Sequence, residues 1–237
     1  MAEQDFKEFK EHVVEIRYKA NPIVLDHRGT WAELISEHME LPHWKIVENR
    51  IDVFSTDQDL HGFVGFKNAG LTARNVPTRN FFPDKAVKLL RYVFQLKEFG
   101  DPVHVERIGV RSRFCTPFEG TFDELRERYL SRFLRLTDEG AAAIGKTAKI
   151  VDIGGPLNFA DRLGNFNTMS GPMVKKQFSD FFTKAADFPD VGLYFDIDYF
   201  LKPDRKVGSK ELVGNVKDFS FEAWDRYERI RNLIIGG

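Results

Sequence analysis

Two stretches of the chain alternate between apolar and charged positions, a pattern typical of β-strands whose two faces have different surroundings. In the first, Val103–Cys115, one face is apolar and the other carries Arg107, Arg111 and Arg113, with Gly109 leaving a gap in the row. We call these three residues the arginine row. Arginines inside a domain must meet carboxylates, an anionic ligand or water.

The second stretch, Val191–Leu201, supplies carboxylates that match the arginine row. Asp196 and Asp198 lie two residues apart, so both point to the same face of the strand, and large apolar residues flank them. We expect these two stretches to be the central strands of the protein, with the aspartates and the arginine row neutralising each other inside the fold.

The remaining periodicity predicts the order β-α-β-β-α-β in the first half of the chain. The predicted strands are Val13–Tyr18, Trp44–Ser55, His61–Arg74 and the arginine strand; one helix follows an N-cap at Thr30, and another begins at Phe82 and ends before Gly100. This is the order of ferredoxin-like folds, in which helices cover one face of an antiparallel sheet.

The second half of the chain repeats this order only roughly. It begins with a predicted helix that has a capping box at Thr121 and Glu124, followed by a strand at Lys149–Ile153. A predicted loop at Gly154–Pro172 has Leu157–Phe159 as an alternative strand, and Val174–Ala185 is a helix or a strand. The aspartate strand, a charged loop at Pro203–Asn215 and a helix capped by Ser220 complete the chain. We therefore predict an α+β fold of antiparallel sheets with helices. Two ferredoxin-like halves, residues 1–118 and an α/β C-terminal half at 119–237, would pack into one compact unit.

Composition limits the classes of partner. The chain has 237 residues, of which 42% are hydrophobic and 23 are Phe, enough to bury a sizeable core. The formal net charge is −1, from 35 basic and 36 acidic residues. The molecule as a whole therefore does not attract nucleic acid or an anionic membrane surface. We expect any binding of nucleic acid to be no tighter than the non-specific range, about 10⁻⁴ to 10⁻⁶ M at physiological salt.

Cysteine content and hydropathy bear on the compartment. The single cysteine, Cys115, allows no intrachain disulfide and no zinc site built from cysteines. No apolar run approaches the roughly 20 residues of a membrane span, and the acidic N-terminal sequence is unlike a secretory signal. We expect a cytoplasmic protein that has no contact with a membrane.

The aspartate pair is also a candidate metal site. Two carboxylates in a D-x-D arrangement can hold Mg²⁺ or Mn²⁺ in nucleases, usually together with a third carboxylate. Asp152 is the best strand-borne candidate for that third ligand. Because the chain already supplies matching arginines, we favour the ion-pair interpretation of Asp196 and Asp198 and predict no metal and no cofactor.

A second basic group follows the arginine row along the chain. Arg126, Arg128, Arg132 and Arg135 lie on the next predicted helix and are candidates for contacts with the phosphates of a nucleic acid. Acidic residues are interleaved with them, as in the i,i+4 pair of Glu124 and Arg128. That interleaving indicates an ordinary solvated helix face.

Two further features of the sequence mimic functional motifs. Gly140–Thr147 matches the P-loop pattern G-x-x-x-x-G-K-[ST]. A P-loop follows a strand and precedes a helix, whereas here a helix is predicted before and a strand after, so we interpret the segment as a connector.

The six histidines lack metal-binding spacing. His27, beside Asp26 and Arg28, is the best acid–base candidate, and Cys115 is predicted to be a small buried apolar side chain.

Three short motifs together suggest a family. Val13–Pro22 reads V-V-E-I-R-Y-K-A-N-P, Glu106–Arg113 reads E-R-I-G-V-R-S-R, and Asp196–Asp198 reads D-I-D. With these motifs the chain resembles a sporadically distributed family of uncharacterised prokaryotic proteins, whose members carry an R-[IV]-G-[LV]-R-Y strand and a late L-D-I-D strand. Ser112 stands where that family usually has tyrosine. The resemblance implies an accessory role in prokaryotes, for example in conflict with phages or mobile elements, and it implies no particular activity.

The favoured function is that of a non-enzymatic interaction or ligand-binding module, for which no catalytic residue is assigned. Arg107, Arg111, Arg113, Asp196 and Asp198 form its candidate ligand site. A protein partner is favoured over nucleic acid because the charge of the chain is balanced. The alternative is a nuclease-like protein that processes RNA or DNA, with a metal at the aspartate pair or a histidine as general acid or base.

Overall fold

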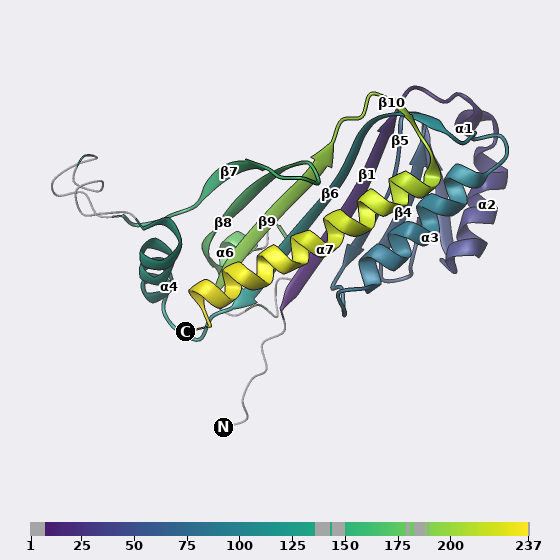
Figure 1. Ribbon diagram of the computed structural model, residues 1–237. Coiled ribbons are helices and arrows are strands. Elements are labelled where there is room, and N and C mark those ends of the chain that lie inside the picture. Colours follow the sequence, from purple (N-terminus) through teal and green to yellow (C-terminus); the bar gives the residue numbers. More distant parts are fainter. Residues whose placement is uncertain are drawn as a thin grey trace.

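One antiparallel sheet runs through the protein (Figure 1). The structure is a computed structural model and describes residues 8–135, 143, 150–178, 181–182, 188 and 190–236. Within these residues the sheet has ten strands: β1 (Phe9–Tyr18), β2 (His43–Val47), β3 (Arg50–Phe54), β4 (Leu60–Gly65), β5 (Asn68–Arg74), β6 (Val103–Pro117), β7 (Gly155–Ala160), β8 (Asn165–Val174), β9 (Val191–Leu201) and β10 (Arg205–Val207). Their order in space is β2-β3-β4-β5-β1-β6-β9-β8-β7, and β10 pairs with β6. The predicted α+β class with a large antiparallel sheet is confirmed.

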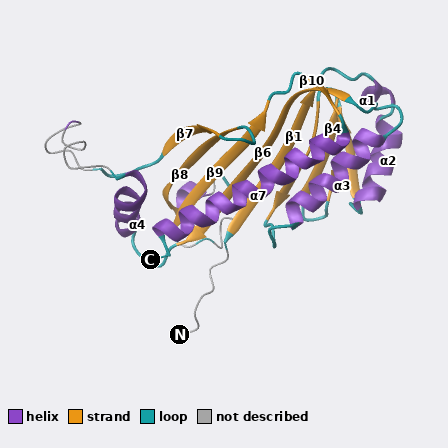
Figure 2. Cartoon of the chain, viewed as in Figure 1, coloured by secondary structure: helices purple, strands orange, loops and turns teal. Residues whose placement is uncertain are grey.

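Helices cover one face of this sheet. The described helices are α1 (Ile23–Asp26), α2 (Arg28–Met39), α3 (Phe81–Gln95), α4 (Phe122–Arg128), which continues as the π-helix η1 (Tyr129–Leu134), α6 (Lys175–Phe178) and α7 (Ser209–Ile234). Figure 2 shows α2, α3 and α7 together on the same side of the strands. Strand residues that point toward them, such as Val14, Ile16 and Val110, are completely buried. None of the described helices combines the length and the apolar character needed to cross a membrane.

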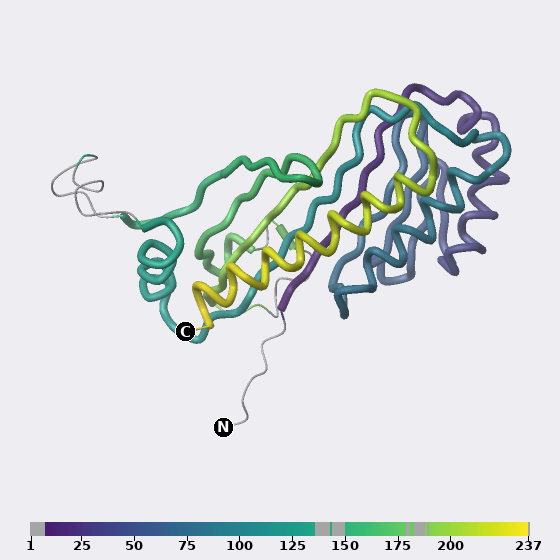
Figure 3. Tube along the Cα trace, viewed as in Figure 1, coloured from purple at the N-terminus to yellow at the C-terminus, as the bar shows by residue number. Residues whose placement is uncertain are grey.

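The sheet continues across the boundary between the two predicted halves. β6, the arginine strand, pairs with β9, the aspartate strand, in a register that runs from Ile108 opposite Leu201 to Pro117 opposite Gly192. Figure 3 shows β1, from the start of the chain, lying beside β6, from its middle, and β9 on the far side of β6. The two stretches predicted to be central are therefore adjacent, but the structure does not establish two ferredoxin-like halves.

Two of the predicted strands are wrong because each is a hairpin. The stretch Trp44–Ser55 forms β2 and β3 around a turn at residues 48–49, and the stretch His61–Arg74 forms β4 and β5 around a bend at residues 66–67. An asparagine lies at or beside each reversal, Asn49 in the first and Asn68 in the second, and asparagine is one of the residues that favour turns.

The second half also departs from the prediction. Residues 150–154 are not a strand. The segment Gly154–Pro172 was predicted as a loop with Leu157–Phe159 as an alternative strand; that alternative is confirmed as part of β7, whereas β8 was not predicted. β8 escaped detection because two residues on its buried face, Thr168 and Ser170, are polar, which removes the apolar period of two. In the stretch Val174–Ala185, residues 175–178 are helical.

The last helix begins 11 residues before Ser220, where a cap was predicted. α7 starts at Ser209, whose backbone N–H and hydroxyl donate to the carboxylate of Asp101 at 3.0 and 2.7 Å. Its buried stripe already includes Leu212 and Val216, and the Ser220 hydroxyl donates back to the Val216 carbonyl at 2.6 Å. The predicted loop at Pro203–Asn215 is therefore wrong. The predicted capping box at Thr121 and Glu124 is confirmed at the start of α4.

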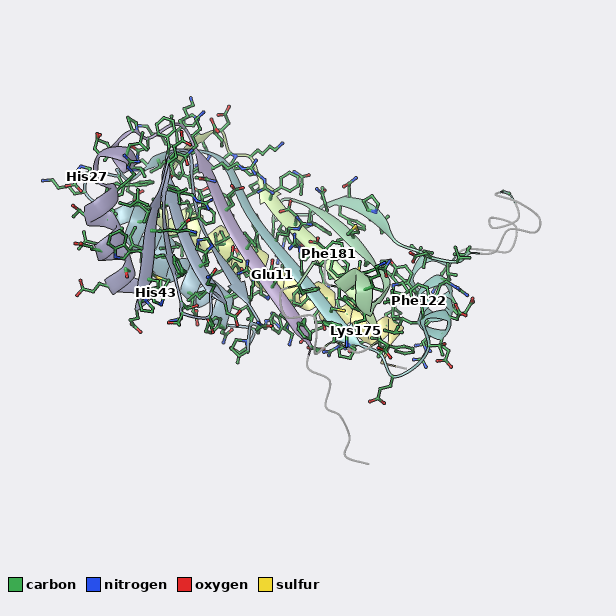
Figure 4. All side chains as sticks on the ribbon, turned by 180° about the vertical axis from the view of Figure 1, so that it is seen from behind. Glu11, His27, His43, Phe122, Lys175 and Phe181 are labelled. Carbon is green, nitrogen blue, oxygen red and sulfur yellow. The ribbon has the colours of Figure 1, made fainter. Side chains whose placement is uncertain are left out.

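The face opposite the helices is the one we call the open face. It carries the odd-numbered residues of β1 and of the arginine row on β6, together with the even-numbered residues of β9. Figure 4 views this face, with Glu11 in its middle and Phe181 and Lys175 toward one end. At that end Phe178 and Phe181 pack with Tyr194 and the buried Cys115, so part of the open face is covered.

Candidate functional site

A hollow of about 460 Å³ lies on the open face. We call it the arginine hollow. Its lining residues come from β1, β6 and β9: Val13, Glu15, Arg17, Arg107, Gly109, Arg111, Arg113 and Asp198. Four arginines but only two carboxylates line it, so its own lining is positively charged.

The arginine row and the aspartate pair form ion pairs, as predicted. Arg107 donates through Nη2 to both carboxylate oxygens of Asp198 at 2.9 Å. Arg111 donates through Nε to Asp196 Oδ1 at 3.0 Å and through Nη2 to Asp196 Oδ2 at 2.5 Å, the fork geometry that makes such pairs strong. The sheet register places Arg111 directly opposite Asp198 instead. Each arginine therefore reaches diagonally along the partner strand.

Gly109 makes the diagonal reach of Arg107 possible. A Cβ atom at residue 109 would lie 2.1 Å from Arg107 Nη1 and 2.6 Å from its Cζ. The guanidinium therefore lies flat against the backbone of β6, in the space that any side chain would fill. The guanidinium of Arg107 thus fills the gap that Gly109 leaves in the arginine row.

The third arginine of the row links two strands. Arg113 donates through Nη1 to Glu11 on β1 at 3.0 Å, and its Nε lies 3.8 Å from Asp196 on β9, too far for a hydrogen bond. Nε of Arg113 is buried and has no hydrogen-bond partner. The Tyr194 hydroxyl donates to Asp196 at 3.1 Å, so this carboxylate contacts a tyrosine and two arginines.

Arg17 adds a fourth guanidinium that the sequence motifs did not single out. The register of β1 and β6 places it directly opposite Arg107, and like charges in such cross-strand pairs repel. The two side chains turn apart: Arg17 Nε donates to Glu15 at 2.7 Å, while Arg107 reaches Asp198. Burial acts to raise the pKa of the Glu15 carboxyl, but hydrogen bonds from Asn68 and Arg17 outweigh it and lower that pKa.

Two cations are the most exposed charged side chains of the hollow. The side chains of Arg17 and Arg111 are 55% and 45% exposed, against 29% for Asp198 and 23% for Glu15. The Asp196 side chain, which is 5% exposed, lies beneath the guanidiniums. The hydrogen bonds to Asp196, opposed by partial burial, raise the pKa of Arg111 further above its ordinary value.

The alternative metal site is not formed. Asp152 lies outside the sheet in the segment 150–154, where its Oδ1 accepts a hydrogen bond from the N–H of Ile153 at 2.7 Å. Asp196 and Asp198 are both bound to guanidiniums. In the described part of the chain, no three His, Cys, Asp or Glu side chains are grouped so as to hold a metal ion.

The second basic group serves the structure at the end of α7. Arg128 and Arg132 donate to carbonyl oxygens there, at 3.5 Å to Ile235 and 3.3 Å to Ile234; these are carbonyls that a helix end leaves without intrahelical partners. Arg126 pairs with Asp123 at 2.7 Å. Arg135 ends η1 in a left-handed conformation, with φ of 49°.

The remaining candidates show no reactive arrangement. His27 stacks on Trp31 at 5.4 Å between ring centroids. Burial raises the pKa of the Cys115 thiol well above its ordinary value, as expected for a buried apolar side chain. The P-loop lookalike at Gly140–Thr147 lies outside the described residues except for Ala143.

No protein-family model matches the chain, and no curated protein is significantly similar to it. Four of the predicted site residues, Arg107, Arg111, Arg113 and Asp198, line the hollow, and Asp196 lies beneath it. The prediction missed Arg17 and Glu15, because their positions opposite Arg107 and Gly109 depend on the register of the sheet.

Proposed function

We propose that this chain is a non-enzymatic binding module and that the arginine hollow is the site that receives an anionic group of its partner. The observation that carries this proposal is the arrangement of Arg17 and Arg107, two like charges opposite each other at the rim of one hollow. Each uses only part of its guanidinium on a carboxylate, so donors remain for a ligand. An anion between them would relieve their repulsion.

In this proposal the aspartate pair orients the arginines, and the arginines contact the ligand. Asp196 and Asp198 hold Arg111 and Arg107 in fixed orientations, and pre-oriented guanidiniums lose less side-chain entropy when a ligand binds. The resemblance to a sporadically distributed prokaryotic family adds an accessory, defence-related role to this proposal. We further infer a ferredoxin-like arrangement for the first half, because β1, α2, β4, β5, α3 and β6 follow the βαββαβ order with β2 and β3 inserted.

Calorimetric titration with inorganic tripolyphosphate at low salt tests the site directly. We expect binding to the wild type and a loss of about tenfold in affinity for Arg17→Gln, because a charge-assisted hydrogen bond is worth about 1.5–3 kcal/mol. Arg17 is the right target because it is mostly exposed and its removal leaves the buried pairs intact. Arg91→Gln, on the exposed side of α3, is the matched control and should bind like the wild type. Equal affinities for all three proteins, or no binding at all, would overturn the proposal.

A further inference from the structure

A row of five residues crosses the open face at right angles to the strands. Direct cross-strand pairing connects Phe63 on β4, Gly70 on β5, Glu15 on β1, Gly109 on β6 and Phe200 on β9. Residues paired in this way share a face. The row places an aromatic ring on each side of the arginine hollow, with a glycine beside each ring and Glu15 at the centre.

Neighbouring side chains fill the space that each of the two glycines leaves. At Gly70 an added Cβ would lie 2.7 Å from the Phe63 ring, so that ring lies over the glycine; at Gly109 the space holds the guanidinium of Arg107. Four strand spacings separate the two phenylalanines, roughly 19 Å. An extended chain of a few nucleotides can span this distance. It would contact both rings and the hollow between them.

Cations accompany both rings. The guanidinium carbon of Arg50 lies 5.8 Å from the centroid of Phe63, and that of Arg107 lies 5.3 Å from the centroid of Phe200. Lys202 Nζ is also 5.8 Å from the Phe200 centroid. Aromatic rings and guanidinium planes beside a positively charged groove are the surfaces on which nucleobases stack.

Side-chain amides continue the open face beyond Phe200. The register of β8 and β9 places Asn165 opposite Phe200 and Asn167 opposite Asp198, and both asparagines are exposed. Each amide offers two donors and an acceptor. Base edges carry the same mixture of donors and acceptors.

We propose that the open face binds single-stranded nucleic acid across the strands, with a phosphate in the arginine hollow and bases against Phe63, Phe200 and the neighbouring asparagines. This inference rests on the proposed function of the hollow and names its partner. An acidic peptide fits less well, because it could place a carboxylate in the hollow but carries no bases to stack on Phe63 and Phe200. The exposed amides of Asn165 and Asn167 match the edges of such bases. The overall charge balance does not oppose such binding, because Arg17 and Arg111 are both exposed on this face.

Fluorescence anisotropy with labelled 15-nucleotide oligo-U and oligo-dT tests the inference. We expect micromolar dissociation constants at about 50 mM salt, and a slope of log K against log [salt] near −2, which corresponds to about three phosphate contacts at −0.7 each. A hairpin duplex of equal charge should bind more weakly, because its bases are not free to stack. Comparison of the two oligomers decides between RNA and DNA.

Phe63→Leu and Phe200→Leu keep an apolar side chain and remove the π-face. Each should weaken binding about tenfold or more, since stacking on one aromatic side chain is worth about a factor of 5 to 150. Phe159→Leu is the matched control. Phe159 is 45% exposed on β7, but it pairs with Phe166, which packs against Arg226 of α7. Phe159 therefore lies on the helix-covered face, away from the proposed site. Thermal melts of each variant establish that it is folded.

Two results would overturn the inference while the anion site stands: tripolyphosphate binds but neither oligonucleotide does, or poly-glutamate competes as well as the oligonucleotides. Unchanged affinity in both Phe63→Leu and Phe200→Leu would also overturn it. Failure of tripolyphosphate to bind would overturn the proposed function of the arginine hollow, and with it the placement of a phosphate there.

Discussion

Asp196 takes part in two of the ion pairs of the open face and is the most deeply buried carboxylate beside the arginine hollow. It accepts a fork of hydrogen bonds from Arg111 and one from Tyr194, and it lies 3.8 Å from Arg113. Its side chain is almost entirely buried. A carboxylate in this position stabilises the fold only as long as its cations are present, since removing one partner leaves the other charge buried and unpaired.

Asp196→Ala should therefore lower the free energy of unfolding by about 3 kcal/mol, the low end for a broken buried pair, because Arg111 can turn part of its side chain to water. Urea denaturation measures this loss. Adding Arg111→Ala should recover part of it, as coupled neighbours do.

Asp123→Ala provides the comparison for this prediction, because Asp123 is 74% exposed and pairs with Arg126 at the surface. It should cost less than about 1 kcal/mol. An unchanged melting temperature in Asp196→Ala would show that the carboxylate has no structural role at the centre of the protein.

At the scale of the element, β6 is a strand in which one missing side chain sets the geometry of the others. Gly109→Ala would place a methyl group 2.1 Å from Arg107 Nη1 and force that guanidinium away from Asp198. We expect a loss of about 1–3 kcal/mol in stability, the cost of leaving a polar group without its hydrogen bonds. Urea denaturation of the variant, alone and with Arg107→Ala, measures the loss and its dependence on Arg107.

Gly214→Ala is the control for that substitution. Gly214 lies in α7, is exposed, and would have nothing within 4 Å of an added Cβ. Alanine there should stabilise the protein by about 0.5–1 kcal/mol, because glycine is a poor helix former. If Gly109→Ala were equally harmless, Arg107 would not depend on the space beside it.

The elements themselves could be predicted where one face is apolar and the other is charged. β6 and β9 meet that condition, and their mutual ion pairing was expected from the arginines on one strand and the aspartates on the other. β8 does not, because Thr168 and Ser170 are buried. The start of α7 was missed because its first turns are charged outside and its stripe there includes only Leu212, Val213 and Val216.

The candidate site could be predicted only in part, for a physical reason. Alternation assigns a residue to a face of its own strand, but it does not say which residues of other strands lie beside it. The position of Arg17 opposite Arg107, and the row from Phe63 to Phe200, depend on four strand registers at once. No local pattern contains that information.

At the scale of the whole molecule, charge is distributed unevenly although it is nearly balanced in sum. The net charge is −1, yet the open face presents Arg17 and Arg111 to solvent above carboxylates that are mostly buried. On the helix-covered face, the histidine His12 is buried. A composition argument averages over both faces, and so it underestimates how positive one of them is.

That histidine, His12, makes the stability of the whole molecule depend on pH. It lies between the rings of Phe82 and Trp224, bonds Ser112 through Nδ1 at 2.8 Å and has no partner for Nε2. Burial, with a smaller contribution from the charge of Lys10, lowers its pKa from 6.5 to about 3. The folded protein therefore keeps His12 neutral at pH values at which the unfolded chain protonates it.

The sign of the effect follows from proton binding. Between the unfolded pKa of 6.5 and the folded value of about 3, the unfolded state binds more protons, so stability falls as pH decreases through this window. The full difference amounts to about 5 kcal/mol. His12→Gln can keep a hydrogen bond to Ser112 without titrating. Below pH 6 the wild type should lose about 1.4 kcal/mol per pH unit more than this variant in urea denaturation. Carboxylates such as Glu8 and Glu15, whose pKa values are lowered, contribute equally to both proteins. Parallel stability curves from pH 7 to 5 would mean that His12 is hydrated or charged in the folded state.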